Sequence, residues 1–404
     1  MSAKHHTRNG LFGVLLAVEG LILAATACAT SEEPVAPEGD EAAAPDARVA
    51  ADTSAPDAPD GSTKDAAVRT CSDQDFCHTA LPPNETLRDV WGDGTNVWSV
   101  SEEGDVLRWD GTAWKVHASA LGALYAVWGS GPTNVWIGGE RGLFHGTGAS
   151  SAALVFAPEA APGNAQAPIR SIWGTGATNV WAVGGYVDAD FLPRGRVLRY
   201  RAAGDAGPSS WVVDPLSSRP LSFTRVWGTT ASGTWVGGDD GSDFAQTGGV
   251  FRRTPTANAF VVVAVRAFDA AAKKDSALVG FTAGGASADG AMLLAGKNGE
   301  ATPGFWRGVT PDGGAEAGSY AWSYGARDLN DLPVHAVWGP SVDDTWAAGD
   351  YGRLRRWDGA LWKQAALMIA DLPVITPLFA MWGASSDDFW VVGRDIALHR
   401  KKRP

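Results

Sequence analysis

The sequence is poor in the residues on which thiol and metal chemistry depend. Among its 404 residues are only three cysteines and seven histidines. The cysteines form no CxxC pair and the histidines form no HExxH motif, so nothing indicates a zinc centre. The GxSxG motif of serine hydrolases does not occur either. The residues therefore point to no specific reaction, and enzymatic activity is left open as the less favoured interpretation.

Positive charge is also scarce. The chain has 33 basic and 45 acidic residues, which gives a net charge of −12 at pH 7. Nucleic-acid-binding domains usually carry a basic face, so we expect no nucleic-acid partner. The segment 29–70 holds ten acidic and three basic residues, and it accounts for more than half of the net charge. The rest of the chain is only mildly acidic.

Long hydrophobic runs are absent except near the N-terminus. Lys4 and Arg8 precede the apolar stretch 11–27, which is short for a membrane span and contains Glu19. We therefore interpret residues 1–27 as a signal peptide. The stretch ATAC, which ends at Cys28, resembles a bacterial lipobox, and this resemblance implies that Cys28 is lipidated. The expected location is the cell envelope, as an outer-membrane lipoprotein. Plain secretion and an uncleaved membrane anchor are the alternatives.

Residues 28–70 are predicted to form the lipidated cysteine and a disordered tether. Alanine, proline and acidic residues dominate this segment and aromatic residues are missing, so it cannot bury enough apolar surface to offset the entropy of ordering. Beyond it, Cys71 and Cys77 flank a short loop, and in an exported protein we expect them to form a disulfide. The alternative is three unrelated thiols.

What the sequence does have is tryptophan, with 19 residues, and glycine, with 50. Most tryptophans belong to a repeated phrase, first written VWGDGTNVWSV at 90–100. The first tryptophans of the six clear copies are Trp91, Trp128, Trp173, Trp227, Trp338 and Trp382. The second tryptophans are Trp98, Trp136, Trp181, Trp235, Trp346 and Trp390. A degenerate copy spans 278–296, and there we expect Phe281 and Leu293 to replace the two tryptophans. The sequence thus contains seven units at the spacing of propeller blades.

Each unit reads as four short strands, with the 19 tryptophans divided six, six, three and four among them. A lone four-stranded sheet cannot cover both of its faces, whereas sheets in a ring cover one another. We therefore predict that residues 71–404 form an all-β fold, a β-propeller with seven four-stranded blades. The last unit has room for three strands only, so an N-terminal strand from 71–86 should close the ring. Six blades plus an irregular cap is the alternative.

The tryptophans are expected to fill the wedge-shaped spaces between twisted blades, since wide flat rings suit such spaces. A row of exposed rings that stack on sugars is the alternative. The glycine that follows each first tryptophan is expected to allow a turn with a positive φ. Asp110 and Asp358 open Asp-Gly hairpins and should fix them by side-chain-to-backbone hydrogen bonds.

The phrase xxVWGxxxxNVWAVGxxGxVLRWDGxxW resembles the repeat of the BNR/Asp-box propellers, in particular the branch that contains the photosystem II assembly factors. The matching residues in the second strand are 98–100, 181–184 and 346–349. In the hairpins they are Asp110 and Gly111 with Trp114, and Asp358 and Gly359 with Trp362. The tethered, tryptophan-rich arrangement is also similar to uncharacterised lipoproteins of myxobacterial-type genomes. The resemblance implies a propeller over about 310 residues and leaves the function open, because propellers serve many functions.

Candidate binding residues lie in long loops between the second and third strands of consecutive units. If the first strand is innermost, these loops share one face of the ring, where loops on a rigid scaffold commonly carry binding. The candidates are Asp188, Asp190, Arg194, Asp239, Asp240 and Asp243. Calcium held by the last three aspartates is a weaker expectation, because their spacing matches no EF-hand loop. No other cofactor is expected, and ordinary solvated loops are the alternative.

Three hypotheses for the function follow. The first is a membrane-anchored binding module or scaffold for a protein or glycan partner at the cell envelope. The second is a glycan-active enzyme of the sialidase-like or lyase type, which charged side chains converging at the channel mouth would favour. The third, an assembly factor for a membrane complex, is implied only by the family resemblance. The side chains at the channel mouth on the long-loop face should discriminate among them.

Overall fold

The computed structural model describes residues 70–201, 203, 209–240, 248–270, 273–311, 319–326 and 333–402. Residues 1–69, which include the predicted signal peptide and Cys28, lie outside the described part, and so does Asp243. Among the described residues, no helix has the length and apolar character needed to cross a membrane.

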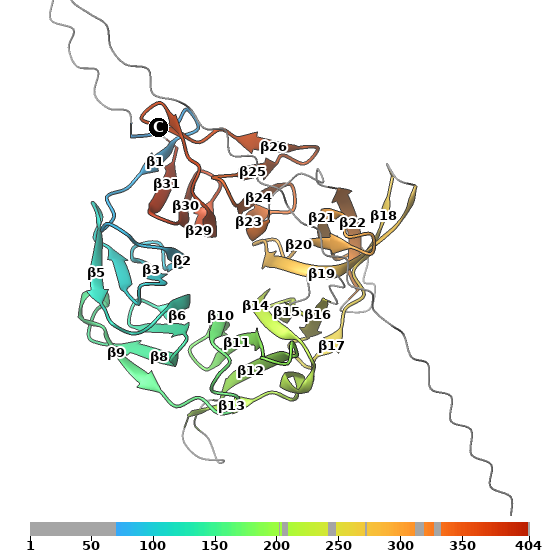
Figure 1. Ribbon diagram of the computed structural model, residues 1–404, viewed down its shortest axis with the longest axis horizontal. Coiled ribbons are helices and arrows are strands. Elements are labelled where there is room, and N and C mark those ends of the chain that lie inside the picture. The colour runs from blue at the N-terminus through green and yellow to red at the C-terminus, as the bar shows by residue number, and fades with distance from the viewer. Residues whose placement is uncertain are drawn as a thin grey trace, which may run out of the picture. The chain divides into compact units, whose positions relative to one another are not determined.

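Seven small antiparallel sheets are arranged around a common centre (Figure 1). Blades 1 and 2 consist of β2 (Leu87–Gly92), β3 (Val97–Ser101), β4 (Val106–Trp109), β5 (Trp114–Ala118), β6 (Leu124–Gly131), β7 (Asn134–Gly139), β8 (Gly142–Thr147) and β9 (Val155–Glu159). Blades 3 and 4 consist of β10 (Ile169–Gly176), β11 (Asn179–Val187), β12 (Pro193–Arg201), β13 (Ser210–Val213), β14 (Ser222–Thr229), β15 (Gly233–Asp239), β16 (Gly249–Arg253) and β17 (Val261–Val262).

The remaining blades follow the same plan with local additions. Blades 5 and 6 consist of β18 (Arg266–Asp269), β19 (Lys274–Ala286), β20 (Met292–Asn298), β21 (Pro303–Val309), β22 (Ala321–Ala326), β23 (Val334–Ser341), β24 (Asp344–Gly349), β25 (Leu354–Trp357) and β26 (Trp362–Ala365). Blade 7 consists of β29 (Leu378–Ser385), β30 (Asp388–Gly393), β31 (Ile396–Lys401) and β1 (Phe76–His78). The connections contain the short 3₁₀ helices η1 (Ser151–Ala153) and η2 (Pro215–Ser218) and the hairpin of β27 (Met368–Ile369) and β28 (Leu372–Pro373).

The predicted seven-bladed β-propeller is confirmed, and the six-bladed alternative is wrong. The ring closes as expected, because β1 pairs with β31 and joins residues more than 300 positions apart in one sheet. Phe76 on β1 is fully buried between Trp346 and Phe389. Next to the seam, a disulfide joins Cys71 and Cys77. Blade 5 has a fifth strand, since β18 pairs with the first residues of the unusually long β19.

The two tryptophans of each repeat occupy different environments. All six second-strand tryptophans are buried in the cores between blades, with at most 3% of their surface exposed. The first-strand tryptophans line a central cavity of about 260 Å³, and four of the six are only partly buried. Packing between blades, as expected from the sequence, therefore describes the second set fully and the first set only in part.

Of the glycines that follow a first tryptophan, only Gly228 has the expected positive φ, at 154°. At Gly129 and Gly174 the backbone φ is not positive, so no turn requires glycine there. Instead, a Cβ on Gly129 would lie 2.5 Å from the ring of Trp91, and one on Gly174 would lie 2.9 Å from the ring of Trp128. Both distances are too short for a real contact. At these two positions glycine is therefore needed because the tryptophan of the preceding blade lies against its backbone.

The degenerate copy in blade 5 differs from the prediction at one of its two positions. Leu293 faces Gly285 across the β19–β20 pair, just as Trp181 faces Trp173 in blade 3. Leu293 thus takes the place of a second tryptophan, as predicted, but the place of the first belongs to Gly285. Phe281 lies before the bulge of β19 and packs between blades, as Phe223 does in blade 4.

An arginine or histidine on the third strand faces the second-tryptophan position in every blade, a regularity that the sequence alone did not predict. The pairs are Trp98 with Arg108, Trp136 with His145, Trp181 with Arg199, Trp235 with Arg252, Leu293 with Arg307, Trp346 with Arg356 and Trp390 with His399. The two histidines stack on their indoles, at 3.8 Å and 4.1 Å between ring centroids. In four blades this residue also contacts the Asn or Asp two positions before the second tryptophan, through a hydrogen bond of 2.6–3.1 Å.

The connection between β1 and β2 contains a buried carboxyl group. Glu85 is 4% exposed, and its Oε2 has no hydrogen-bond partner among the described residues. Burial, together with the nearby carboxylates of Asp105 and Glu103, raises the pKa of Glu85 to about 7. Because the pKa is higher in the folded chain than in the unfolded one, the folded state is most favoured when Glu85 is protonated. Stability is then lost as the pH rises from about 4.5 to about 7.

We therefore expect Glu85→Gln to raise the melting temperature at pH 8 and to have little effect at pH 5. Melting curves across this pH range would measure the difference between variant and parent, and all other titrating groups are common to both proteins. Glu159→Gln, which removes a partly exposed carboxylate outside this cluster, is the control and should not reproduce the gain that Glu85→Gln gives at pH 8. A Glu85→Gln difference that is independent of pH would contradict the assigned pKa.

Candidate functional site

Each innermost strand contains a β-bulge at the same position. In β2, Leu87 pairs with Ser101 and Asp89 pairs with Val100, so Arg88 is the extra residue between them. The same one-residue shift occurs in the inner strand of every blade. A bulge redirects the side chain of the extra residue and increases the local twist. Seven side chains are thus redirected at equivalent places around the ring.

These seven residues come together at one end of the central cavity, in a depression of about 400 Å³ that we call the mouth. The bulge residues are Arg88, Tyr125, Arg170, Thr224, Thr282, His335 and Phe379. Gly185, Tyr186, Ser222 and Arg225 complete the lining. The repeat thus collects one side chain from each blade into a single site, which is rich in arginine and aromatic residues.

Two of the arginines at the mouth lie over aromatic rings. The guanidinium carbon of Arg170 is 4.2 Å from the ring centroid of Tyr125, and that of Arg88 is 4.2 Å from the ring centroid of Phe379. Arg88 also forms an ion pair with Glu102, at 2.7 Å. The stacking holds both planar groups in a defined orientation, which prepares their remaining N–H groups to bind an acceptor.

Acidic residues from the turns between second and third strands surround the mouth. The Tyr125 hydroxyl donates to Glu140 at 3.2 Å, and His335 contacts Asp350 at 2.8 Å. Burial raises the pKa of Tyr125 above its usual value, and the nearby Arg170 partly offsets this rise. Since these turns are adjacent to the mouth, the face on which we expected ligand binding is the face on which the mouth opens.

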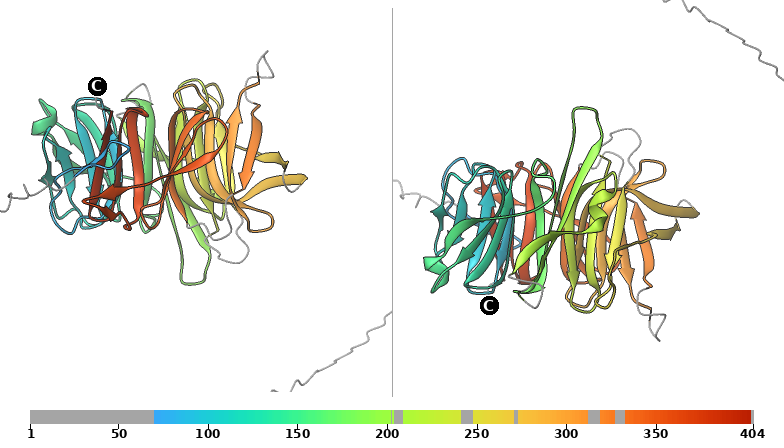
Figure 2. Two further views of the ribbon diagram at one scale, coloured as in Figure 1. Left: turned by 90° about the horizontal axis from the view of Figure 1, so that it is seen from above. Right: turned by 90° about the horizontal axis from the view of Figure 1, so that it is seen from below.

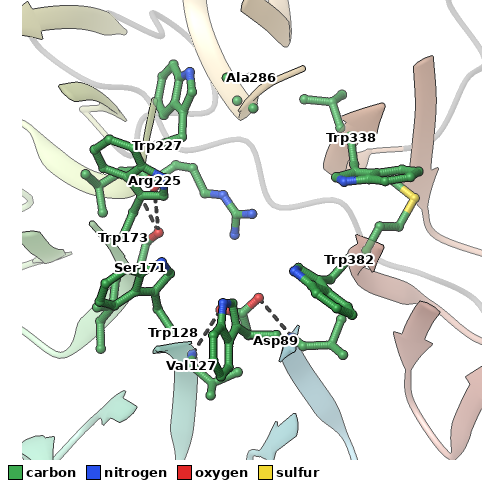
Figure 3. A pocket seen from close by; sticks show the side chains of 18 of the residues that line it. Asp89, Val127, Trp128, Ser171, Trp173, Arg225, Trp227, Ala286, Trp338 and Trp382 are labelled. Carbon is green, nitrogen blue, oxygen red and sulfur yellow. Dashed lines mark hydrogen bonds between the residues drawn. The ribbon is translucent and has the colours of Figure 1, made fainter. Parts of the chain in front are cut away.

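Arg225 connects the mouth to the central cavity. It is half-buried and lines both spaces, and Figure 3 shows its guanidinium group directed into the ring of first-strand tryptophans. Among the described residues, no hydrogen bond or ion pair joins the side chain of Arg225 or of Arg170 to a carboxylate. Two guanidinium groups at the mouth therefore keep donors for a ligand.

Asp89 is the carboxylate in the central cavity, opposite Arg225 in Figure 3. Its Oδ2 accepts a hydrogen bond from the backbone N–H of Val127 in blade 2, at 3.0 Å. In the same way, the Ser171 hydroxyl accepts from the N–H of Val226 in the next blade, at 3.1 Å. Burial raises the pKa of Asp89, and the charge of Arg225 partly offsets this rise. Asp89 and Ser171 thus link neighbouring blades below the mouth.

The sequence-predicted site residues of blade 3 lie in the hairpin of β11 and β12, which projects from one face of the ring (Figure 2). Asp188 Oδ1 accepts hydrogen bonds from the N–H groups of Asp190 and Leu192, and Asp188 Oδ2 accepts from Arg194 at 2.7 Å. These bonds lower the pKa of Asp188. Asp188 and Arg194 thus hold the hairpin tip in shape, and the tip presents Phe191, which is 86% exposed.

The other predicted residues lie at the corresponding loop of blade 4. Asp239 ends β15 opposite Ser222, and Asp240 follows it. The third residue of the suggested calcium site, Asp243, is outside the described residues, so calcium binding stays a prediction. Within the described ranges, no three His, Cys, Asp or Glu side chains form a group suited to a metal ion. The structure brings Asp188 and Arg194 together and does not place the whole set in one site.

Comparisons with known proteins identify the fold only. No model of a known protein family matches the sequence, and no curated protein is similar to it. Among solved structures, "YCF48 bound to D1 peptide" has a TM-score of 0.56 at 16% identity, covering 83% of this chain and 100% of that chain. YCF48 from Cyanidioschyzon merolae gives a TM-score of 0.55 at 13% identity, with coverages of 81% and 98%. The RRP9 WD40 repeats give 0.50 at 10% identity, with coverages of 83% and 99%.

All three of these structures are far below the identity at which function can be transferred, so the similarity establishes the propeller architecture alone. It agrees with the propeller implied by the resemblance to the photosystem II assembly factors. The predicted lipidation of Cys28 and the location at the cell envelope are outside what these comparisons address.

Proposed function

We propose that the protein is a binding module that recognises an acidic segment of a protein partner at the mouth. We further propose that Cys28 is lipidated and that residues 28–70 tether the propeller to a membrane of the cell envelope. The observation that carries the first proposal is the pair of guanidinium groups, Arg170 and Arg225, neither of which is hydrogen-bonded or ion-paired to a carboxylate among the described residues. The aromatic rings beside them add apolar surface for a peptide.

The chemistry of the mouth favours such a ligand over a neutral one. An arginine that binds a carboxylate replaces hydration with two parallel charge-assisted hydrogen bonds. Tyr125 already stacks on Arg170, so less side-chain entropy is lost when the ligand binds. One of the similar structures, YCF48, is described as bound to a D1 peptide. This supports a peptide-sized ligand for the present chain, and a role in assembling a larger complex would be consistent with such a ligand.

The proposal can be tested by selecting peptides from a random library with the purified full-length chain. We expect peptides rich in Asp and Glu, with binding that weakens as the ionic strength rises. The double variant Arg170→Gln/Arg225→Gln should recover none of them. The control Arg201→Gln/Arg219→Gln makes the same change in charge at exposed positions that do not line the mouth, and it should behave like the parent. Selection of neutral or basic peptides would overturn the proposal.

A glycan-active enzyme is the second candidate, because arginines, tyrosines and carboxylates do converge at the mouth. The carboxylates nearest the mouth are engaged, however, since Glu102 binds Arg88, Glu140 binds Tyr125 and Asp350 binds His335. Turnover of a sialoside or uronide substrate that is lost in Glu140→Gln would favour the enzyme over the binding module.

A further inference from the structure

A second polar pocket lies between blades 3 and 4, on the face opposite the mouth. Its volume is about 180 Å³, and its wall includes the turns that join first to second strands in both blades. The residues used below are Thr175, Asn179, Trp181, Arg199, Thr230 and Arg253. The pocket is separate from the mouth. The mouth lies at the start of the inner strands, whereas the pocket lies at their far end.

Two arginines in this pocket share one indole. The guanidinium carbons of Arg199 and Arg253 lie 5.4 Å and 5.2 Å from the ring centroid of Trp181. Burial, and then the like charge of Arg199, lower the pKa of Arg253. Arg253 donates to the carbonyl of Ala257 and lies 3.5 Å from Asp214. Among the described residues, the side chain of Arg199 makes no hydrogen bond and no ion pair.

The same arrangement recurs between blades 6 and 7, where it is neutralised. Arg356 and Arg400 each lie 5.4 Å from the ring centroid of Trp346. There, Arg356 binds Asp344 at 2.8 Å and Arg400 pairs with Asp387 at 3.5 Å. Asp387 lies in the turn between β29 and β30, and Asp344 is the first residue of β24, directly after the turn of blade 6. Both arginines between blades 6 and 7 thus have a carboxylate partner, whereas between blades 3 and 4 only Arg253 has one among the described residues, Asp214.

The pocket between blades 3 and 4 lacks these two carboxylates. By the spacing from the flanking tryptophans, Asn179 stands where blade 6 has Asp344, and Ser232 stands where blade 7 has Asp387. The Asn179 amide donates to the Thr175 hydroxyl at 2.8 Å, which leaves that hydroxyl able to donate in turn. A positively charged pocket lined by hydroxyl and amide groups is complementary to an oxyanion.

We propose that this pocket binds a phosphate or sulfate group, either as the free ion or as an ester, between Arg199 and Arg253. The oxyanion takes the place of the carboxylates present between blades 6 and 7. The threonine hydroxyls donate hydrogen bonds to those oxygen atoms of the phosphate or sulfate group that the guanidinium groups do not reach. Two positive charges held near one another without a full complement of carboxylates favour a group with negative charge on several oxygens.

The test is calorimetric titration of the full-length chain with inorganic phosphate at fixed ionic strength, in the Arg170→Gln/Arg225→Gln background so that the mouth does not contribute. We expect saturable binding. Arg199→Gln should weaken it by at least about tenfold, since a hydrogen bond to a charged group is lost. Asn179→Asp should abolish it, because it restores the carboxylate found in blade 6. Arg356→Gln, the matched change between blades 6 and 7, should leave the affinity unchanged.

Parallel titrations with sulfate and with glucose 6-phosphate distinguish the possible sources of the oxyanion. Tighter binding of the ester than of free phosphate would identify a phosphorylated molecule as the occupant, and equal binding would identify the free ion. The proposal is overturned if phosphate does not bind, or if Arg199→Gln and Asn179→Asp bind it as tightly as the background protein does. Melting curves without phosphate confirm that each variant is folded.

Discussion

Replacing Trp235 with alanine is expected to lower the free energy of unfolding by about 3–5 kcal/mol, the usual cost of removing a buried tryptophan. The Trp235 side chain has no exposed surface and packs against Trp227, Tyr320 and Trp322. Arg252 covers the remaining side at 5.4 Å. The alanine variant would leave a cavity between blades 4 and 5 that this closely packed surface cannot easily fill. Chemical denaturation of variant and parent measures the loss.

Two further variants make this prediction specific. The indole N–H of Trp235 has no hydrogen-bond partner among the described residues, so Trp235→Phe loses no hydrogen bond and should cost only about 1–2 kcal/mol. Trp382 is the first-strand counterpart, partly exposed in the central cavity, and Trp382→Ala should cost clearly less than Trp235→Ala. Equal losses at Trp235 and Trp382 would mean that the two sets of tryptophans do not have different roles.

The second large effect is expected at the closure of the ring. Phe76→Ala should also cost about 3–5 kcal/mol, because Phe76 is fully buried against Trp346 and Phe389. Its strand holds the first and last parts of the propeller together through only three paired positions. Because Phe76→Ala removes packing at the seam, amide hydrogen exchange should become faster in β31 before it becomes faster in blades 1 to 6.

The disulfide beside the seam provides a comparison. The double variant Cys71→Ser/Cys77→Ser opens a loop of only about seven residues, so the chain-entropy estimate is a loss of about 2 kcal/mol. It should therefore destabilise the protein less than Phe76→Ala does. If Phe76→Ala costs less than about 1 kcal/mol, closure by β1 does not contribute to stability in the way that the burial of Phe76 indicates.

The architecture could be predicted because the repeat occurs seven times, in six clear copies and one degenerate copy. The pairing of Trp173 with Trp181 and of Trp227 with Trp235 recurs at equivalent places, and the short last unit indicated that a strand from elsewhere completes blade 7. Two details of the phrase were misinterpreted. Glycine was assigned to turns because the sequence does not show which ring lies against Gly129, and Phe281 was aligned with tryptophan because both are aromatic.

The mouth was not predicted, although the sequence contains a signal for it. Leu87 and Val90 are both buried but three residues apart, which simple alternation along a strand does not allow. The same spacing of apolar residues recurs in the other clear copies, so an extra residue had to be accommodated at Arg88 and its equivalents. The length of the loops instead favoured Asp188 and Arg194 as site residues, and in the structure these two hold a hairpin tip.

The oxyanion pocket could not have been found from one repeat alone. Arg199 and Arg253 are unremarkable in sequence, and only their position over Trp181 reveals that they share a site. The difference from blades 6 and 7 rests on two residues, Asn179 in place of Asp344 and Ser232 in place of Asp387. Alignment of the repeats on their tryptophans identifies such differences once the arginine or histidine that faces the second tryptophan is known.

The most direct test of the proposed function is the affinity of a selected acidic peptide for three forms of the full-length chain. The double variant Arg170→Gln/Arg225→Gln should bind about 100-fold more weakly than the parent, because two hydrogen-bonded charges are lost. The control Arg201→Gln/Arg219→Gln should keep the parental affinity. Equal affinities for all three forms, measured by calorimetry at one ionic strength, would show that the mouth is not where the peptide binds.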